Sequence, residues 1–334
     1  PAYSDELISL NGGFDRLAEL AEAAQYEVLF SNMWYDEDAG DDSPGRVLAE
    51  AVSALYANLE ANPDQYPRGI TVRILLGNPP EVAKGEFTGQ IWHVLNDLRN
   101  AGLPEMRNEA LGWSVEVADF EGTMPHSHIK SMIVDGKTAV AAGFNMSYDH
   151  FDADHPSGLG NGRFDLGIQV TGPVAQDARQ MFDDLWQGSN RIHCRDFYPN
   201  LIPWETTCIP NEATNDHAPE VLKYYLTQDD TTAFSMYRTE ARDEADQQII
   251  AAFASAEETI DAIQVNFTTE MICDLNILYD QVCTDDHLLP YMEAMMDAAQ
   301  NNGTQIRILI KGAPIDGVES GVHLDVLKLS LIHI

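Results

Sequence analysis

The amino-acid sequence predicts an α/β protein built from two copies of one strand–helix–strand unit. The apolar run of residues 24–35 returns in residues 256–267, at an offset of 232. A second apolar run, in residues 69–80, returns in residues 303–314 at an offset of 234. Both copies follow the order strand, helix, strand, which is that of a βαβ unit. Because the two offsets nearly agree, the sequence indicates a tandem duplication.

Each expected element follows from its local pattern. Runs rich in β-branched and aromatic residues are typical of buried strands, and amphipathic stretches are typical of helices. In each copy a helix precedes the second strand, in residues 46–59 and 288–299. The first copy continues with a helix in residues 91–100, a strand in 113–118, a hairpin in 129–142, a strand in 166–170 and a helix that ends near Trp186.

The repeat also predicts the domain organisation. Residues 1–190 would form the first half, and residues 235–334 the N-terminal part of a second half. Between them, residues 191–234 contain Pro203, Pro210 and scattered polar residues, a composition typical of a connecting segment.

Length and composition are those of a globular protein. The 334 residues allow about two domains, and 44% are hydrophobic and 22% charged. With 19 basic and 54 acidic residues the formal net charge is −35. This charge excludes a general nucleic-acid coating role, which needs clustered Lys and Arg. No apolar run reaches the roughly 18 residues that span a bilayer.

The four cysteines form two local pairs, Cys194 with Cys208 and Cys273 with Cys283. None belongs to a Cys-x-x-Cys pattern, which argues against a zinc ribbon. Two short-loop disulfides would be typical of an exported protein, and four buried thiols of a cytosolic one. We expect two disulfides and an extracellular or periplasmic location, with the cytoplasm as the alternative.

One segment of the first copy, residues 125–145, carries the candidate chemistry. His128 and Lys130 share one side of a strand, because side chains alternate along it. Asp135-Gly136 is a strong hairpin signal, so the chain should turn there and bring Gly143 and Asn145 back to the start of the strand. An imidazole can attack phosphorus, and Lys and Asn can hold phosphate oxygens. Gly143 would allow a close approach of the backbone.

This pattern, His-x-Lys-x4-Asp followed by Gly-x-Asn, resembles the HKD motif of the phospholipase D superfamily. Its members are built from two similar α/β halves, which agrees with the repeat. Residues 164–173, followed by a helix with Phe182 and Trp186, resemble the segment that follows the motif strand. The resemblance implies a tandem duplicated phospholipase D-like α/β/α sandwich, whose second half is incomplete in this chain.

The resemblance also assigns roles. His128 is the motif histidine, either the nucleophile that forms a phosphohistidine or its general-acid partner. Lys130 and Asn145 bind the phosphate with it, and Asp165 takes the place of an acidic residue that orients the histidine. Asp135 completes the catalytic motif, although we expect it to tie the turn rather than to carry a proton. The joint spacing favours these roles over an ordinary strand histidine and a solvated lysine.

No metal or cofactor is expected, because relatives of this type resemble metal-independent catalysts. An alternative is a metal site with oxygen and nitrogen ligands. Its candidate ligands are His126, Asp149, His150, Asp152, Asp154 and His155. We prefer the interpretation that these residues form a solvated loop at the mouth of the site. The acidic residues 36–42 lack the spacing of an EF-hand and are interpreted as a surface loop. Met292, Met295 and Met296 have helical spacing and are expected in a core.

A member of this family needs two motifs. The offset of 234 would put the second histidine near position 362, about 28 residues after Ile334. Neither His323 nor His333 has a lysine and an aspartate at the motif spacing. The chain also begins at Pro1 without an apolar leader and stops within an apolar run. We therefore expect a fragment, truncated before the second motif and inactive alone.

Three functions stay open. The first is a phospholipase D-like phosphodiesterase or phosphatidyltransferase, in which one histidine attacks and the other protonates the leaving alcohol. The second is an HKD-family nuclease, against which the net charge counts. The third is a non-catalytic binding protein with one motif. The expected partner is a phospholipid or another phosphodiester. Peripheral membrane contact is compatible with that substrate, and neither a stable nucleic-acid complex nor a transmembrane segment is expected.

Overall fold

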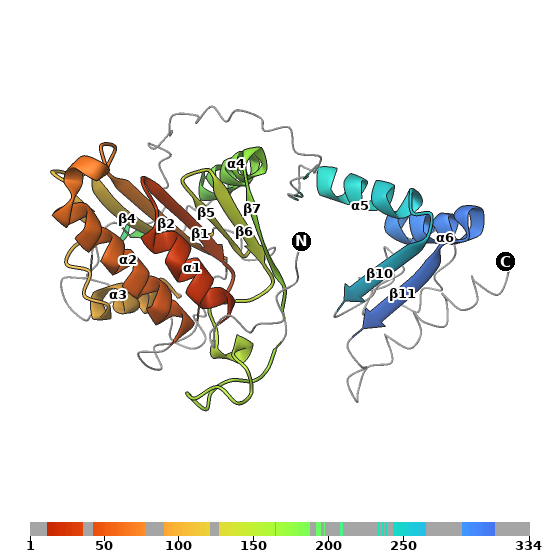
Figure 1. The fold of residues 1–334 in the computed structure, drawn as a ribbon, viewed down its shortest axis with the longest axis horizontal. Coiled ribbons are helices and arrows are strands. Elements are labelled where there is room, and N and C mark those ends of the chain that lie inside the picture. Colours follow the sequence, from red (N-terminus) through yellow and green to blue (C-terminus); the bar gives the residue numbers. More distant parts are fainter. Residues whose placement is uncertain are drawn as a thin grey trace. The chain divides into compact units, whose positions relative to one another are not determined.

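The computed structural model describes two units of the chain, which divide at Phe234 and Ser235 (Figure 1). The described residues are 12–35, 43–77, 90–120, 127–163, 165–187, 192–194, 197, 208–209, 233, 236, 238, 243–264 and 289–310. Each unit combines helices with a sheet, so the α/β prediction is confirmed. The acidic stretch 36–42 and the cysteines Cys273 and Cys283 lie outside the described part.

The described strands of the first unit form one sheet in the order β7-β6-β5-β1-β2-β4-β8-β9, with β3 paired to β4. Strands β1, β2 and β4 are parallel, and β5, β6 and β7 continue the sheet in antiparallel pairs from β1. Their bounds are β1 Glu27–Asn32, β2 Ile70–Leu76, β3 Arg107–Asn108, β4 Trp113–Asp119, β5 Ser131–Val134, β6 Thr138–Ala142, β7 Gly167–Thr171, β8 Ile192–Cys194 and β9 Cys208–Ile209.

Helices cover both faces of this sheet, so that all six residues of β1 are buried. The helices are α1 Gly13–Glu22, α2 Pro44–Ala61, α3 Ile91–Asn100 and α4 Pro173–Gln187. Val28 and Phe30 pack in one core with apolar residues of α1, α2 and α3. Strand side chains alternate, and the other face, which carries Glu27 and Arg73, contacts α4. This is an α/β/α sandwich.

Helix α2 shows how the local sequence sets an element. Ser43 precedes it, and its hydroxyl accepts a hydrogen bond from the Arg46 N–H at 3.0 Å. Pro44 occupies the first turn, where a missing N–H costs nothing. The helix therefore begins two residues before the predicted start and ends at Ala61.

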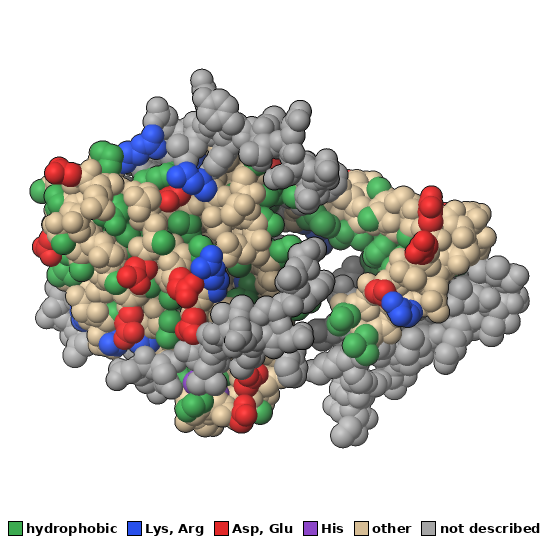
Figure 2. All heavy atoms as spheres, viewed as in Figure 1, with side chains coloured by type: hydrophobic (Ala, Val, Ile, Leu, Met, Phe, Trp, Pro, Cys, Tyr) green, Lys and Arg blue, Asp and Glu red, His purple; other side chains and the backbone are tan. Residues whose placement is uncertain are grey.

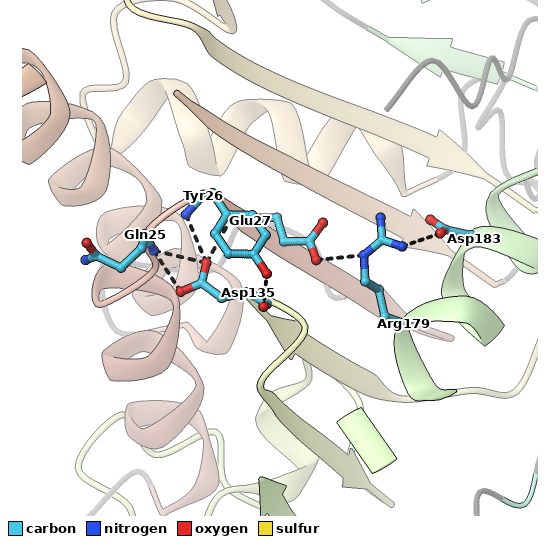
Figure 3. A network of polar contacts seen from close by, with 6 residues as sticks. All are labelled: Gln25, Tyr26, Glu27, Asp135, Arg179 and Asp183. Atoms are coloured by element: carbon cyan, nitrogen blue, oxygen red, sulfur yellow. Dashed lines mark hydrogen bonds and ion pairs between the residues drawn. The ribbon is translucent and has the colours of Figure 1, made fainter. Parts of the chain in front are cut away.

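A chain of charged side chains attaches α4 to the sheet (Figure 3). Arg179 on α4 donates to Glu27 of β1 at 2.8 Å and to Asp183 at 2.7 Å. Burial raises the pKa of both carboxyls, while Arg179 opposes that shift. Because a buried charge that loses its partner is costly, these ion pairs specify where α4 lies on the sheet.

The predicted hairpin is confirmed. Strands β5 and β6 pair antiparallel, with Val134 opposite Thr138. Asp135 and Gly136 form the turn with φ angles of 54° and 58°, and the Lys137 N–H donates to the Val134 carbonyl at 3.0 Å. Positive φ at both positions is what a tight hairpin turn requires, and Asp and Gly tolerate it.

The second unit contains α5 Glu244–Ala254, β10 Thr259–Gln264, α6 Pro290–Asn302 and β11 Gln305–Ile310. Strands β10 and β11 are parallel, with Thr259 opposite Gln305. In the first unit Glu27 lies opposite Thr71, so the offsets of 232 and 234 map one register onto the other. Met292 and Met295 are buried against Ile260, as their helical spacing predicts, and Met296 is half-buried.

The expected connecting segment contains two short strands. Strand β8 pairs antiparallel with the end of β4, and β9 pairs with β8, so these residues extend the sheet of the first unit. In this register Cys194 lies opposite Cys208. The disulfides stay a prediction.

Candidate functional site

The candidate site lies at the end of the sheet where β1 and β2 finish. Strand β5 runs antiparallel to β1, with Ser131 opposite Ser31. The residues just before β5 therefore lie at the carboxyl end of β1, an edge at which α/β sheets commonly bind ligands. The Ala142 N–H donates to the Lys130 carbonyl at 3.0 Å. The hairpin thus returns the chain beside Lys130, as the sequence predicts.

Lys130 and His128 are in direct contact. The Nζ of Lys130 lies 3.2 Å from Nδ1 of His128 and donates to the His128 carbonyl oxygen at 3.0 Å. Lys130 is buried, whereas His128 is exposed to solvent. Burial lowers the pKa of Lys130 to about 8, and the negative charge of Asp165 opposes that shift. The pair thus presents a cation and an accessible imidazole together.

Asn145 follows β6 and is half-buried. Its Oδ1 is buried and has no hydrogen-bond partner within the described residues. A buried polar atom without a partner is unfavourable in a finished structure, and such atoms are common where a ligand binds. Asn145 Oδ1 is therefore a buried acceptor that none of the described residues around it uses.

Asn32, at the end of β1, holds the backbone on both sides of Asn145. Its Oδ1 accepts from the Met146 N–H at 3.2 Å, and its Nδ2 donates to the Phe144 carbonyl at 3.4 Å. The side chain is buried. Asn32 is not predicted as a site residue from the sequence. The one sequence feature that could have pointed to Asn32 is its position as a polar residue at the carboxyl end of a largely apolar strand.

Gly77, directly after β2, positions the segment that leads into His128. The Ser127 N–H donates to the Gly77 carbonyl at 3.2 Å, and the Gly77 N–H donates to the Asn32 carbonyl at 2.9 Å. A Cβ at position 77 would collide with the carbonyl oxygen of Ser127. The two backbones can approach this closely only because residue 77 is glycine.

Asp165 lies next to Gly143 and His150. Its Oδ2 is 2.9 Å from Nδ1 of His150, and a Cβ at position 143 would be 2.5 Å from its Oδ1. Gly143 therefore permits the approach of a carboxylate. From the sequence, His150 is predicted only as one member of the alternative metal-ligand set. Its contact with Asp165 could not be predicted from the sequence, because the two residues are 15 positions apart and no periodic pattern joins them.

Asp135 lies at the opposite end of β5 from Lys130. At about 3.3 Å per strand residue, five residues separate the two by roughly 16 Å. Its carboxylate accepts hydrogen bonds from the backbone N–H groups of Gln25, Tyr26 and Glu27, at 2.9–3.1 Å (Figure 3). Asp135 therefore ties the hairpin turn to the start of β1, which is the structural role expected from the sequence, and it lies at the far end of β5 from Lys130.

The alternative metal set does not assemble among the described residues, where no group of three or more His, Cys, Asp or Glu side chains could hold a metal ion. His126 lies outside that part of the chain. The ring of His155 stacks on Phe151 at a centroid distance of 4.0 Å, and its Nδ1 lies 2.8 Å from the Ser157 hydroxyl.

Comparison with known proteins finds similar solved structures at low sequence identity. No family model matches it. It is similar to a phospholipase D family member, Nuc from Salmonella typhimurium (14% identity, TM-score 0.32, 55% of this chain and 88% of that one). It is similar to NucT from Helicobacter pylori, with 13% identity and a TM-score of 0.33, and the match covers 55% of this chain and 92% of that one. It is also similar to phosphatidylserine synthase from Haemophilus influenzae, with 12% identity and a TM-score of 0.49, and the match covers 91% of this chain and 60% of that one.

Two uncharacterized proteins of Helicobacter pylori, from strains J99 and 26695, are each 25% identical to this chain. The matches cover 191 and 184 residues, or 56% and 54% of this chain. They cover 34% and 33% of the relatives, so the chain spans about a third of their length.

Proposed function

We propose that the first unit is the first HKD half of a phospholipase D-like phosphodiesterase or phosphatidyltransferase. The observation that carries this proposal is the contact of Lys130 Nζ with His128 Nδ1, at 3.2 Å, beside the loop of Asn145. The motif spacing and this contact support the same conclusion, because a phosphate-binding histidine needs an adjacent cation.

In the proposed reaction, His128 is either the nucleophile that becomes the phosphohistidine or the general acid that assists its formation. Either its imidazole nitrogen attacks phosphorus while a second histidine protonates the departing alkoxide, or the roles are exchanged. Water or another alcohol then attacks the phosphohistidine and releases the histidine. Lys130 and Asn145 bind the non-bridging oxygens, on which negative charge accumulates in the transition state.

The second histidine must come from a second motif. The 334 residues contain one His-x-Lys sequence, so this chain contributes one of the two histidines. We propose that the second unit is the beginning of the second half, which its matching strand register supports. General acid catalysis contributes about 10²–10⁴-fold to a rate, and the chain alone should accordingly show almost no turnover.

We propose a phospholipid, or another phosphodiester of low charge density, as the substrate. The net charge of −35 would repel a nucleic acid outside the site. Figure 2 shows acidic side chains scattered over the visible face of the first unit, with no broad basic patch among its described residues. Of the described helices, none is both long and apolar enough to cross a membrane.

Anion binding tests the site in the chain as it stands. Isothermal titration calorimetry would measure the affinity of tungstate, a tetrahedral phosphate analogue. Lys130→Ala should weaken binding at least about tenfold, because it removes a charge-assisted hydrogen bond. Lys137→Ala removes the same charge from the exposed turn at the far end of the hairpin and should leave the affinity unchanged. Equal losses in both variants would refute the proposed site.

Turnover tests the need for a second motif. The chain should be essentially inactive on bis(p-nitrophenyl) phosphate and on phosphatidylcholine vesicles. Robust turnover that His128→Ala abolishes would show that two copies of this motif meet in a dimer. Selective cleavage of DNA over both other substrates would instead favour the nuclease.

A further inference from the structure

We propose that His150 is a positioning residue that holds the carboxylate of Asp165 beside Gly143. This inference rests on the proposed function for its effect on phosphate binding. The arrangement of His150 and Asp165 itself does not depend on that function.

His150 is held rigidly before any ligand binds. It ends the short 3-10 turn η3, Tyr148–His150, in which the Ser147 hydroxyl accepts from the Asp149 N–H at 3.3 Å. The His150 N–H donates to the Ser147 carbonyl at 3.2 Å. The His150 side chain is only 7% exposed. Its ring therefore has little freedom to move.

Asp165, by contrast, depends on its neighbours for its position. Its side chain is 33% exposed and lies just before the edge strand β7. One carboxylate oxygen is 2.9 Å from Nδ1 of His150, and the other faces Gly143. Without the imidazole, the carboxylate could turn toward solvent, because nothing else within the described contacts holds that oxygen.

The protonation state of His150 affects the electrostatic attraction between Asp165 and Lys130, because the ring contacts the carboxylate. Three charged groups face the ring: Asp165 and Asp149 favour its protonation, and Arg163 opposes it. Burial is the largest effect and lowers the pKa of His150 below its ordinary value. Nδ1 of His150 lies within hydrogen-bond distance of Asp165 Oδ2 without being aligned for a bond, and a neutral ring with its proton on Nδ1 can donate to the carboxylate without cancelling its charge. The negative charge of Asp165 raises the pKa of Lys130 against the larger effect of burial.

Two substitutions separate positioning from packing. His150→Leu fills the space but cannot donate a hydrogen bond, whereas His150→Asn places an amide nitrogen near the position of Nδ1. His155→Leu is the matched control, because it removes another buried histidine of the same loop. The readouts are the titration of Lys130, followed by NMR of its labelled side chain, and the affinity for tungstate.

We expect His150→Leu to lower the pKa of Lys130 below the value of about 8 and to weaken tungstate binding severalfold near that pH. His150→Asn should retain most of both properties, and His155→Leu should change neither. An unchanged Lys130 titration in His150→Leu, in a chain that remains folded, would overturn the inference. So would equal effects of Leu and Asn.

The two proposals fail in different ways. If wild-type protein does not bind tungstate, the proposed function fails. The titration of Lys130 would still report whether His150 positions Asp165.

Discussion

Lys130 Nζ and His128 Nδ1 lie 3.2 Å apart at the start of β5, although Lys130 is buried and His128 is exposed. The same ammonium group donates to the His128 carbonyl at 3.0 Å. One cation therefore contacts both the backbone and the ring of the motif histidine. A phosphate oxygen that binds Lys130 would be brought directly beside that ring.

Anion affinity should depend on pH through Lys130. Its pKa of about 8 means that the side chain is charged below pH 8 and neutral above it. Tungstate binding should therefore weaken as the pH rises through about 8, while the charge of tungstate itself stays constant. Calorimetric titrations across this range would measure the effect, and Lys130→Arg should remove the midpoint because arginine stays protonated. A midpoint retained in Lys130→Arg would assign the titration to another group.

The same shift predicts a pH dependence of stability. Lys130 binds fewer protons in the folded state than in the unfolded state between about 8 and its ordinary value of 10.5. The free energy of unfolding contributed by this group should accordingly rise with pH in that window. Urea unfolding of wild type and Lys130→Met at several pH values would measure it. Identical pH profiles for the two proteins would contradict the prediction.

Asp135→Ala should destabilise the first unit without affecting the site. The substitution removes the acceptor of three backbone N–H groups and places alanine at a φ of 54°. From the usual value of hydrogen bonds to charged groups, we expect a loss of roughly 3 kcal/mol in the free energy of unfolding. Urea unfolding would measure the loss.

Two controls accompany Asp135→Ala. Asp177→Asn, at an exposed position of α4, should cost little. Tungstate affinity of the folded Asp135→Ala protein should equal that of wild type. A loss of tungstate affinity in folded Asp135→Ala protein would show that Asp135 contributes to the anion site.

Gly77→Ala should weaken tungstate binding and lower stability together. The added Cβ collides with the Ser127 carbonyl, so the segment that leads to His128 must move. Gly102→Ala is a suitable control, because its φ of 86° causes backbone strain while no atom lies within 4 Å of the added Cβ. Thermal unfolding and calorimetry would separate the two variants. Normal tungstate affinity in Gly77→Ala would show that the motif tolerates the displacement.

Cys194 and Cys208 should form a disulfide under oxidising conditions. Residues opposite one another in an antiparallel pair have Cα atoms about 4.5–5.5 Å apart, which lies within the range that a disulfide spans. A loop of this length contributes about 3 kcal/mol by the chain-entropy estimate. Peptide mapping after alkylation would detect the bond. Full alkylation of both thiols in the oxidised protein would refute it and favour a cytoplasmic location.

Local sequence patterns predicted the repeated strand–helix–strand units and the turn at Asp135-Gly136, both of which the fold confirms, and they singled out His128, Lys130 and Asn145 as candidates. These features depend on side-chain periodicity, turn chemistry and spacing, which act over a few residues. The contact of His150 with Asp165, the positions of Asn32 and Gly77 beside the candidate site, and the extension of the sheet by β8 and β9 became visible only in the folded chain. The tertiary structure also identified the backbone N–H groups of Gln25, Tyr26 and Glu27 as the partners of Asp135. Each of these depends on contacts between segments far apart in the chain, which packing brings together and which no local pattern records.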